Sequence, residues 1–289
     1  MKKKWFFALG ILLLCCIIAA ATAVWIQHRE WLSIDTENTQ QDGWNYTVPV
    51  TKNIESLVHQ GNLLLINNQY PIHPEGVKND IAVVAKQTDP EQHYGLLDRK
   101  IMLSRQATEQ FQKMTAAAAK EGVHSFLLSS GYRNWDKQDE LYREKGADYA
   151  LPAGHSEHNF GLSLDIGSTL TTMNEAPEGK WLEQNAWKYG FILRYPKDKV
   201  DITGIQYEPW HFRYVGLPHS AIMYKQNMVL EQYLDFLKEQ QEIAVELDGH
   251  EYHIRYYHAA PNTTIYAPLQ GSYEISGDNR EGIIVTAKK

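Results

Sequence analysis

Cysteine is almost missing from this sequence. Only two of its 289 residues are cysteine, Cys15 and Cys16, and they are neighbours near the N-terminus. The chain beyond them can form no disulfide bond and has no thiol nucleophile. This excludes a small disulfide-stapled fold and a cysteine hydrolase, so a hydrophobic core of ordinary size must hold the fold together.

Charged side chains are absent from residues 5–26, which read WFFALGILLLCCIIAAATAVWI. As a helix this stretch spans about 33 Å, close to the roughly 30 Å hydrocarbon core of a bilayer. Lysines precede it in residues 1–4, which favours a cytoplasmic N-terminus and an exported remainder. We therefore expect a cytoplasmic tail over 1–4 and a single-pass transmembrane anchor over 5–26. A cleaved signal peptide is the alternative, because residues 19–23 are small, but the apolar run continues beyond them.

Basic side chains are scarce outside this region. Without Lys2, Lys3 and Lys4, 25 basic side chains remain against 35 acidic ones, a formal charge of −10. Nucleic acid attracts proteins through positive charge, so we do not expect it as a partner.

The rest of the chain indicates an α+β protein. Residues 27–59 are polar and weakly periodic and are predicted to be a spacer; ordered structure is expected to begin near residue 60. Apolar spacing and punctuation by glycine then predict helices over 104–122, 134–146, 180–190 and 219–240, and strands over 123–131, 162–166, 191–195 and 207–215. Pro209 in the last of these strands predicts an edge or a bulge.

The final stretch, residues 242–289, has a different pattern. Two alternating runs flank Asp248-Gly249, which is typical of a β-hairpin. We expect a small β-rich appendage there, after a main domain over 60–241. The aromatic and histidine-rich sequence 250–258 is explained better by hairpin alternation than by a second metal site.

The stretch AGHSEHNFGLSLDI, residues 153–166, contains the first candidate metal ligands. His158 lies in a loop that enters a strand, and Asp165 lies on the face of that strand opposite its leucines. A catalytic zinc site needs about three such ligands and one open position. The pair alone is weak, because a surface histidine and a strand-end aspartate have the same spacing.

Two further segments carry candidate catalytic residues. In YEPWHFRY, His211 offers another imidazole, and Glu208 is a carboxylate suited to take a proton from a metal-activated water. In SSGYRNWDKQ, Arg133 follows an apolar strand and is suited to stabilise an oxyanion. Each has an ordinary alternative, a strand-edge charge for Glu208 and a solvated arginine for Arg133.

Together, SGYR, SEHNFGLSLD and EPWH resemble the signature of the VanY-type D-alanyl-D-alanine carboxypeptidases. That signature is S-G-Y/F-R, S-x-H-x-x-G-x-A/S-x-D and E-x-W-H in this order, and Ser156 and Gly161 also match it. The family is grouped with VanX-type D,D-dipeptidases and shares a zinc peptidase fold with Hedgehog signalling domains. The resemblance spans about residues 60–240 and implies a mixed sheet with flanking helices.

The resemblance also implies roles for individual residues. One zinc ion per chain would be bound by His158, Asp165 and His211, with Glu208 as the catalytic base and Arg133 stabilising the tetrahedral intermediate. His155 falls outside the motif and is not expected to be a ligand. The residues expected to line the substrate pocket are Gln138, Ser156, Tyr132 and Trp210.

The implied function is removal of the terminal D-alanine from peptidoglycan precursors that end in D-Ala-D-Ala, outside the cell membrane. Loss of that terminus would remove the target of glycopeptide antibiotics such as vancomycin. An L,D-carboxypeptidase and a D,D-dipeptidase of the same fold are the alternatives among enzymes. A non-catalytic wall-binding module is disfavoured by Glu208 and Arg133, which a purely structural zinc site does not need.

Overall fold

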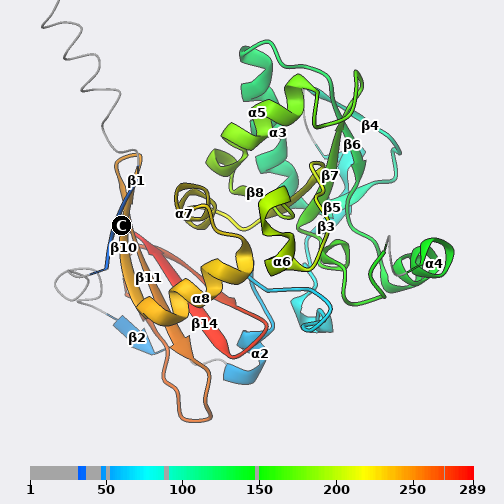
Figure 1. Cartoon of the computed structure of the whole chain (residues 1–289). Coiled ribbons are helices and arrows are strands. Elements are labelled where there is room, and N and C mark those ends of the chain that lie inside the picture. Colours follow the sequence, from blue (N-terminus) through cyan, green and yellow to red (C-terminus); the bar gives the residue numbers. More distant parts are fainter. Residues whose placement is uncertain (1–31, 37–46, 50–52, 88–90, 147–149, 270) are drawn as a thin grey trace, which may run out of the picture.

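The structure is a computed structural model that describes residues 32–36, 47–49, 53–87, 91–146, 150–269 and 271–289 (Figure 1). Two five-stranded sheets dominate it, each with its own hydrophobic core. In Figure 1 the sheet built largely from the C-terminal strands lies on the left, and the other sheet lies on the right with its helices.

The first sheet has the strand order β4-β6-β7-β9-β8. These strands are β4 Tyr94–Leu96, β6 Phe126–Ser130, β7 Ser163–Ser168, β9 His211–Tyr214 and β8 Phe191–Leu193. Only the β4–β6 pair is parallel; the other neighbours in this sheet are antiparallel. The sheet is therefore mixed, as expected for this α+β class.

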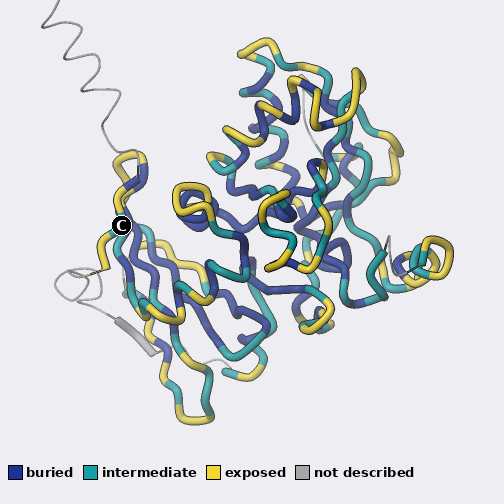
Figure 2. Tube along the Cα trace, in the orientation of Figure 1, coloured by how far each residue is buried: buried dark blue, intermediate teal, exposed yellow. Residues whose placement is uncertain are grey.

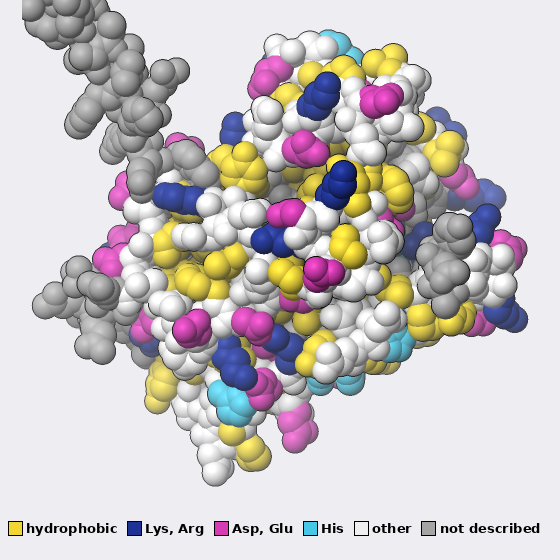
Figure 3. Space-filling view, viewed as in Figure 1, with side chains coloured by type: hydrophobic (Ala, Val, Ile, Leu, Met, Phe, Trp, Pro, Cys, Tyr) yellow, Lys and Arg dark blue, Asp and Glu magenta, His cyan; other side chains and the backbone are white. Residues whose placement is uncertain are grey.

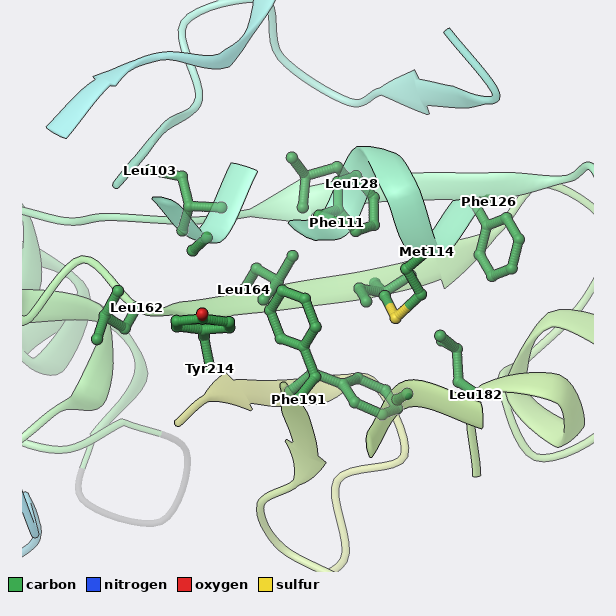
Figure 4. Close-up of a cluster of buried hydrophobic side chains, with 14 of the residues drawn as sticks. Leu103, Phe111, Met114, Phe126, Leu128, Leu162, Leu164, Leu182, Phe191 and Tyr214 are labelled. Atoms are coloured by element: carbon green, nitrogen blue, oxygen red, sulfur yellow. The ribbon is translucent and has the colours of Figure 1, made fainter. Parts of the chain in front are cut away.

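Helix α3, Arg105–Lys120, covers one face of this sheet and ends near Gly122 as its sequence predicts. Phe111 and Met114 point from α3 toward Leu164 of β7 (Figure 4), and all three are fully buried. The other helices of this unit are α4 Trp135–Lys145, α5 Pro177–Asn185 and α6 Val200–Thr203. Burying each large apolar side chain contributes about 1.5–3 kcal/mol, so this layer is a main source of stability.

The second sheet is antiparallel throughout, in the order β1-β10-β11-β14-β13. Its strands are β1 Leu32–Asp35, β10 Glu242–Leu247, β11 His250–His258, β14 Gly282–Lys288 and β13 Ser272–Gly277. The hairpin predicted at Asp248-Gly249 is confirmed: both residues have positive φ, as a two-residue hairpin turn requires.

One long helix was predicted over residues 219–240, and this prediction is wrong. The chain forms α7, His219–Gln226, and α8, Leu230–Gln240, separated at Asn227, which adopts the left-handed conformation with φ 51°. Asparagine tolerates this conformation better than most residues, so it ends α7. The break lets α8 pack its buried side, including Tyr233 and Leu237, against the second sheet.

The strand predicted over 207–215 is shorter than expected. Only His211–Tyr214 forms β9, which lies between β7 and β8 and is therefore not an edge strand. Pro209 lies in the turn before the strand, where its missing N–H removes no ladder hydrogen bond. The expectation of an edge or bulge at Pro209 is wrong for this reason.

The segment Asn62–Ile66 joins the two cores. Its apolar side chains alternate, with Leu64 and Ile66 in the first core and Leu63 and Leu65 in the second. Successive residues of an extended chain point to opposite sides, so one short stretch can serve both cores. We call residues 62–72 the seam segment.

Shorter elements complete the described fold. The remaining pairs of strands are β3 Ile81–Val83 with β5 Met102–Ser104, and β2 Thr47–Pro49 with β12 Tyr266–Pro268. Short helices are α2 Ile54–Val58, η1 Pro74–Gly76, η2 Val84–Lys86, η3 Glu157–Asn159, η4 Ala186–Tyr189 and η5 Lys197–Lys199. Burial follows both sheets, while loops and helix outer faces are exposed (Figure 2).

The N-terminal region differs from its prediction where the structure describes it. Strands β1 and β2 lie within the expected spacer, and β1 pairs with β10. Four residues are too few for a period to be read, so this strand escaped prediction. The predicted anchor over 5–26 lies outside the described residues; within them, no helix has the length and apolar character to cross a membrane.

Candidate active site

A pocket of about 690 Å³ opens beside strands β7 and β9 of the first sheet. Its lining includes Arg133, Gln138, Ser156, His158, Asp165, Glu208, Trp210 and His211. Three sequence-distant motifs therefore meet in one cavity. Tyr132 is the one predicted site residue that is not part of this lining; its backbone N–H donates to the carbonyl of Met102 at 2.7 Å.

His158, Asp165 and His211 lie together in this pocket. Asp165 and His211 are paired across β7 and β9, and one ligand atom from each of the three residues falls within 4.8 Å of the others. His158 Nε2 is 3.4 Å from Asp165 Oδ2, and His211 Nδ1 is 3.2 Å from Asp165 Oδ1. Strand pairing thus brings Asp165 and His211 together, and the short helix η3 places His158 beside them.

The orientation of His158 is set by its other ring nitrogen. Nδ1 lies 2.7 Å from the carbonyl oxygen of Gly131, so Nδ1–H donates there and Nε2 is left facing Asp165. Burial lowers the pKa of His158, which favours the neutral imidazole that binds metals. Such an outer hydrogen bond is a regular feature of metal-ligating histidines.

His211 is oriented in the opposite sense. Its Nε2 lies 3.4 Å from a carboxylate oxygen of Glu157, and its Nδ1 faces Asp165 and lies 3.6 Å from Glu208. Burial lowers the pKa of His211, but hydrogen bonding to Asp165 and Glu157 outweighs burial and raises it to about 9. The surrounding carboxylates thus favour positive charge at this point.

These residues fit a metal ion. Asp165 presents one carboxylate oxygen to each imidazole, Oδ2 to His158 and Oδ1 to His211, so the three side chains direct their donor atoms at one another. Two imidazole nitrogens and one carboxylate oxygen are a donor set that Zn²⁺ uses in catalytic sites.

Glu208 and Arg133 line the same pocket as the ligand group. Burial raises the pKa of Glu208, partly opposed by His211. Burial also lowers the pKa of Arg133, against the opposing influence of Asp165 and Glu208. Arg133 Nε is buried without a hydrogen-bond partner among the described residues, although its backbone is fixed by a bond to the His158 carbonyl. This guanidinium can donate into the pocket.

Glu157 is a residue that the sequence analysis missed. It is 1% exposed and accepts from Arg194 Nε at 2.8 Å, from Arg213 Nη1 at 2.7 Å and from Ser163 Oγ at 2.9 Å. Burial raises its pKa, but Arg213 and Arg194 outweigh burial and hold the pKa well below its ordinary value. A charged carboxylate therefore stands behind His211. The sequence signal that could have pointed to a buried carboxylate was an arginine within each of two apolar stretches, Arg194 in FILRY and Arg213 in HFRY.

The ion pairs around Glu157 also reach the second sheet with the helices α7 and α8 that pack on it, which we call the second unit; the first sheet and its helices are the first unit. Arg194 also forms a two-pronged ion pair with Glu231 of α8, at 2.6 and 2.9 Å. Buried ion pairs need such additional hydrogen bonds to offset desolvation. His211 is therefore linked through Glu157 and Arg194 to a helix that packs on the second sheet.

The remaining predicted pocket residues have distinct positions. Gln138 is 1% exposed, donates from Nε2 to the Leu151 carbonyl at 2.6 Å, and keeps Oε1 without a partner among the described residues. Ser156 caps the short helix η3, and Trp210 is 42% exposed. His155 lies outside the ligand group: its Nδ1 is 2.9 Å from the carbonyl oxygen of Asn67.

Comparison with known proteins agrees with the geometry. The family model described as VanY, D-alanyl-D-alanine carboxypeptidase, matches residues 100–217. A D-alanyl-D-alanine carboxypeptidase of Enterococcus faecium is 58% identical over 232 residues, which cover 80% of this chain and 77% of that protein. The chain belongs to the VanY family. The resemblance carried by the three motifs is thereby confirmed.

Solved structures extend this VanY assignment to the fold. The vancomycin resistance D,D-dipeptidase VanXYg, in complex with a D-Ala-D-Ala phosphinate analogue, has a TM-score of 0.71 at 29% identity, covering 89% of this chain and 99% of that one. A VanY D,D-pentapeptidase variant in complex with Zn(II) has a TM-score of 0.50 at 32% identity, covering 60% and 98%. The expected zinc peptidase fold is confirmed.

Proposed function

We propose that this VanY-family chain is a zinc-dependent D,D-carboxypeptidase that removes the terminal D-alanine from peptidoglycan precursors ending in D-Ala-D-Ala. The observation that carries the proposal is the meeting of His158, Asp165 and His211 with Glu208 and Arg133 in one pocket. The relative that is 58% identical bears the same activity in its name. One zinc ion would be held by the three ligands.

The side chains divide the reaction between them. Zn²⁺ in this site would lower the pKa of water and polarise the scissile carbonyl. Glu208 would take a proton from the attacking water and deliver it to the departing D-alanine nitrogen. Arg133 would donate to the oxygen that becomes negative as the carbonyl is attacked. Gln138, Ser156 and Trp210 would bind the substrate around the reacting bond.

The biological consequence follows from the product. Glycopeptide antibiotics bind peptides that end in D-Ala-D-Ala, so removal of the terminal residue would lower their binding and support vancomycin resistance. The VanXYg and VanY proteins to which this chain is similar are both described as vancomycin resistance enzymes.

A second candidate function is cleavage of the free dipeptide. It is favoured by the similarity to the D,D-dipeptidase VanXYg over 89% of this chain. Free D-Ala-D-Ala carries an ammonium one residue before the scissile bond, where a longer peptide has a neutral amide. Burying that ammonium unpaired would cost several kcal/mol, on the order of 10²-fold or more in rate. We therefore place the longer peptide first and the dipeptide second.

The deciding experiment measures D-alanine release by the full chain from a pentapeptide and from D-Ala-D-Ala at equal concentrations. A tetrapeptide substrate in the same assay tests the L,D-carboxypeptidase alternative. We expect the pentapeptide to be cleaved fastest, a chelator to abolish release, and added zinc to restore it. Faster release from the dipeptide or tetrapeptide would replace the proposed substrate, and release that survives chelation would remove the metal from the proposal.

The cellular placement is also a proposal. The charge-free residues 5–26 and the lysines before them support a single-pass anchor in the cell membrane, with the catalytic domain outside. We further propose a catalytic domain over 60–241 and an appended β-rich unit over 242–289. Full-length protein should sediment with membranes, and protease added to intact spheroplasts should digest it. Mature protein that begins after residue 21 or 23 would instead support signal-peptide cleavage.

A further inference from the structure

The seam segment contributes one side chain to the active-site pocket. Asn67 closes a tight turn: its side chain accepts from the N–H groups of Gln69 at 2.9 Å and Tyr70 at 3.0 Å. The turn presents Asn68, which is exposed and lines the pocket. Asn68 lies outside the region 100–217 that the family model covers, so no catalytic motif includes it.

The turn that presents Asn68 is hydrogen-bonded to residues that directly precede Ser156. His155 Nδ1 donates to the Asn67 carbonyl at 2.9 Å, and the Ile72 N–H donates to the Gly154 carbonyl at 2.7 Å. His155 immediately precedes Ser156, which also lines the pocket. These bonds place Asn68 on the same side of the pocket as Ser156, and Gln138 lines the same pocket.

The second unit holds the turn from the other side. Asn279, between β13 and β14, donates from Nδ2 to the carbonyls of Leu65 and Pro71, both at 2.9 Å. Its Oδ1 is 2.7 Å from His59 Nδ1, and its backbone N–H donates to Val58 at 2.9 Å. These bonds fix both ends of the loop that carries Asn68.

Asparagine suits this position for two reasons. Asn279 has φ 63°, in the left-handed region that asparagine and glycine adopt most readily. Its side chain is 4% exposed, so its amide hydrogens need partners, and the two seam carbonyls supply them. The Asn279 side chain therefore joins the turn between β13 and β14 to the seam segment.

We propose that Asn68 contacts the terminal residue of the substrate as a specificity-determining residue, and that Asn279 is the positioning residue that holds it there. The inference rests on the proposed carboxypeptidase function. The Asn68 amide would donate to the substrate carboxylate beside Ser156 and Gln138. The second unit, which contains Asn279, would thus shape the substrate pocket by holding the seam-segment loop that carries Asn68.

The first test compares variants of Asn68 in the full chain, with D-alanine release from a pentapeptide as the readout. N68A should raise KM about 5–10-fold, the loss expected for one partly solvated hydrogen bond to a charged group, with kcat and zinc content unchanged. N68D should raise KM further, because a carboxylate would face the substrate carboxylate. Q69A, an exposed neighbour outside the pocket, is the matched control and should match the wild type.

A pentapeptide with a C-terminal amide identifies the contact. Wild type and N68A should cleave it with the same KM, because the carboxylate is gone. An N68A effect that persists on the amide would overturn the assignment to the terminal carboxylate. Equal KM values for wild type, N68A and N68D on the acid substrate would overturn Asn68 as a contact.

The second test asks whether Asn279 acts through Asn68. N279G keeps the left-handed backbone and removes the amide, so it should raise KM to a similar extent without loss of zinc. The N68A/N279G double variant should show no further increase, since both changes remove one contact. Increases that multiply would overturn the positioning role. Wild type that releases no D-alanine would overturn the proposed function itself, an outcome distinct from active enzyme with unchanged variants.

Discussion

The two units of this molecule use buried histidines differently. In the first unit, His158 and His211 are brought together from distant parts of the chain, and each directs a ring nitrogen at Asp165. In the second unit, the buried His219 bonds to Tyr233 at 2.7 Å and to Thr286 at 3.0 Å. Both ring nitrogens of His219 thus lie beside hydroxyl groups, whereas the two histidines of the first unit face a carboxylate, the arrangement proposed to hold zinc.

Charged side chains on the surface differ from those around the pocket. Acidic and basic side chains are interspersed over the face shown in Figure 3, in water, where exposed ion pairs contribute little. Around the pocket, charges are buried and act at short range in a medium of lower polarity. We therefore expect variants of the first unit to change activity more than stability, and variants of the second unit to do the reverse.

Glu208 should show the largest effect. Glu208→Gln keeps the shape of the side chain but removes the base, so kcat should fall by about 10²–10⁴-fold. Zinc content and thermal midpoint should stay close to those of the wild type. The measurement is steady-state D-alanine release together with metal analysis, and turnover near the wild-type rate would remove Glu208 from the mechanism.

Arg133→Ala should follow, with a fall in kcat of about 10²–10³-fold, since it removes a donor to the developing oxyanion. Zinc content should be unchanged because Arg133 is not one of the proposed ligands. Arg143→Ala, on the exposed side of α4, is the control. A lower zinc content with normal turnover per zinc would show that Arg133 supports the metal site instead.

Glu157→Gln should weaken zinc binding by about 10–100-fold, the range typical for an outer partner of a metal-ligating histidine. The readout is a competition titration with a chromophoric chelator. Glu178→Gln is the matched control, because Glu178 is equally buried in the same unit and bonds Ser125 and Ser168 instead. Equal zinc affinities for the two variants would contradict the role of Glu157 behind His211.

The stability of the second unit should depend on pH through His219. Burial lowers the pKa of His219 to about 3, whereas an unfolded histidine titrates near 6.5. Protons therefore bind the unfolded chain first, and stability is lost as pH falls below about 6.5. At pH 5 the loss should be about 2 kcal/mol.

Urea unfolding at pH 7 and pH 5 measures that loss. The pH-dependent difference should shrink by this amount in His219→Gln, whatever that variant does to stability at pH 7. Replacing the exposed His124 by Gln should leave the difference as in the wild type. A difference of equal size in all three proteins would show that other groups cause it.

Much of the first unit was predictable because its signals are local. The helix over 105–120 follows from apolar spacing, and the proposed ligand triad follows from short motifs that resemble the VanY signature. Glu157 was not predictable in this way, because its role depends on Arg213 of β9 and on Arg194, which directly follows β8. Only tertiary packing distinguishes such arginines from ordinary strand residues.

The contributions of the seam segment and β1 could not be predicted from the sequence for a related reason. Leu63 and Leu64 are both apolar, and nothing in the sequence shows that they serve different cores. Asn279 looks like an ordinary turn residue until the carbonyls of Leu65 and Pro71 are placed beside it. Long-range pairing of this kind leaves no periodic signal.

The pairing of β1 with β10 has a consequence for folding. Leu32 lies opposite Leu247, and these positions are 215 residues apart, the difference of their numbers. At about 5–20 residues per second, a ribosome needs roughly 10–40 s to make the chain between them. The strands of the first sheet, within residues 94–214, are complete earlier. The first described strand to be synthesised must therefore wait, unpaired, while the active-site sheet can already form, and contacts of such sequence separation are the slow ones to close.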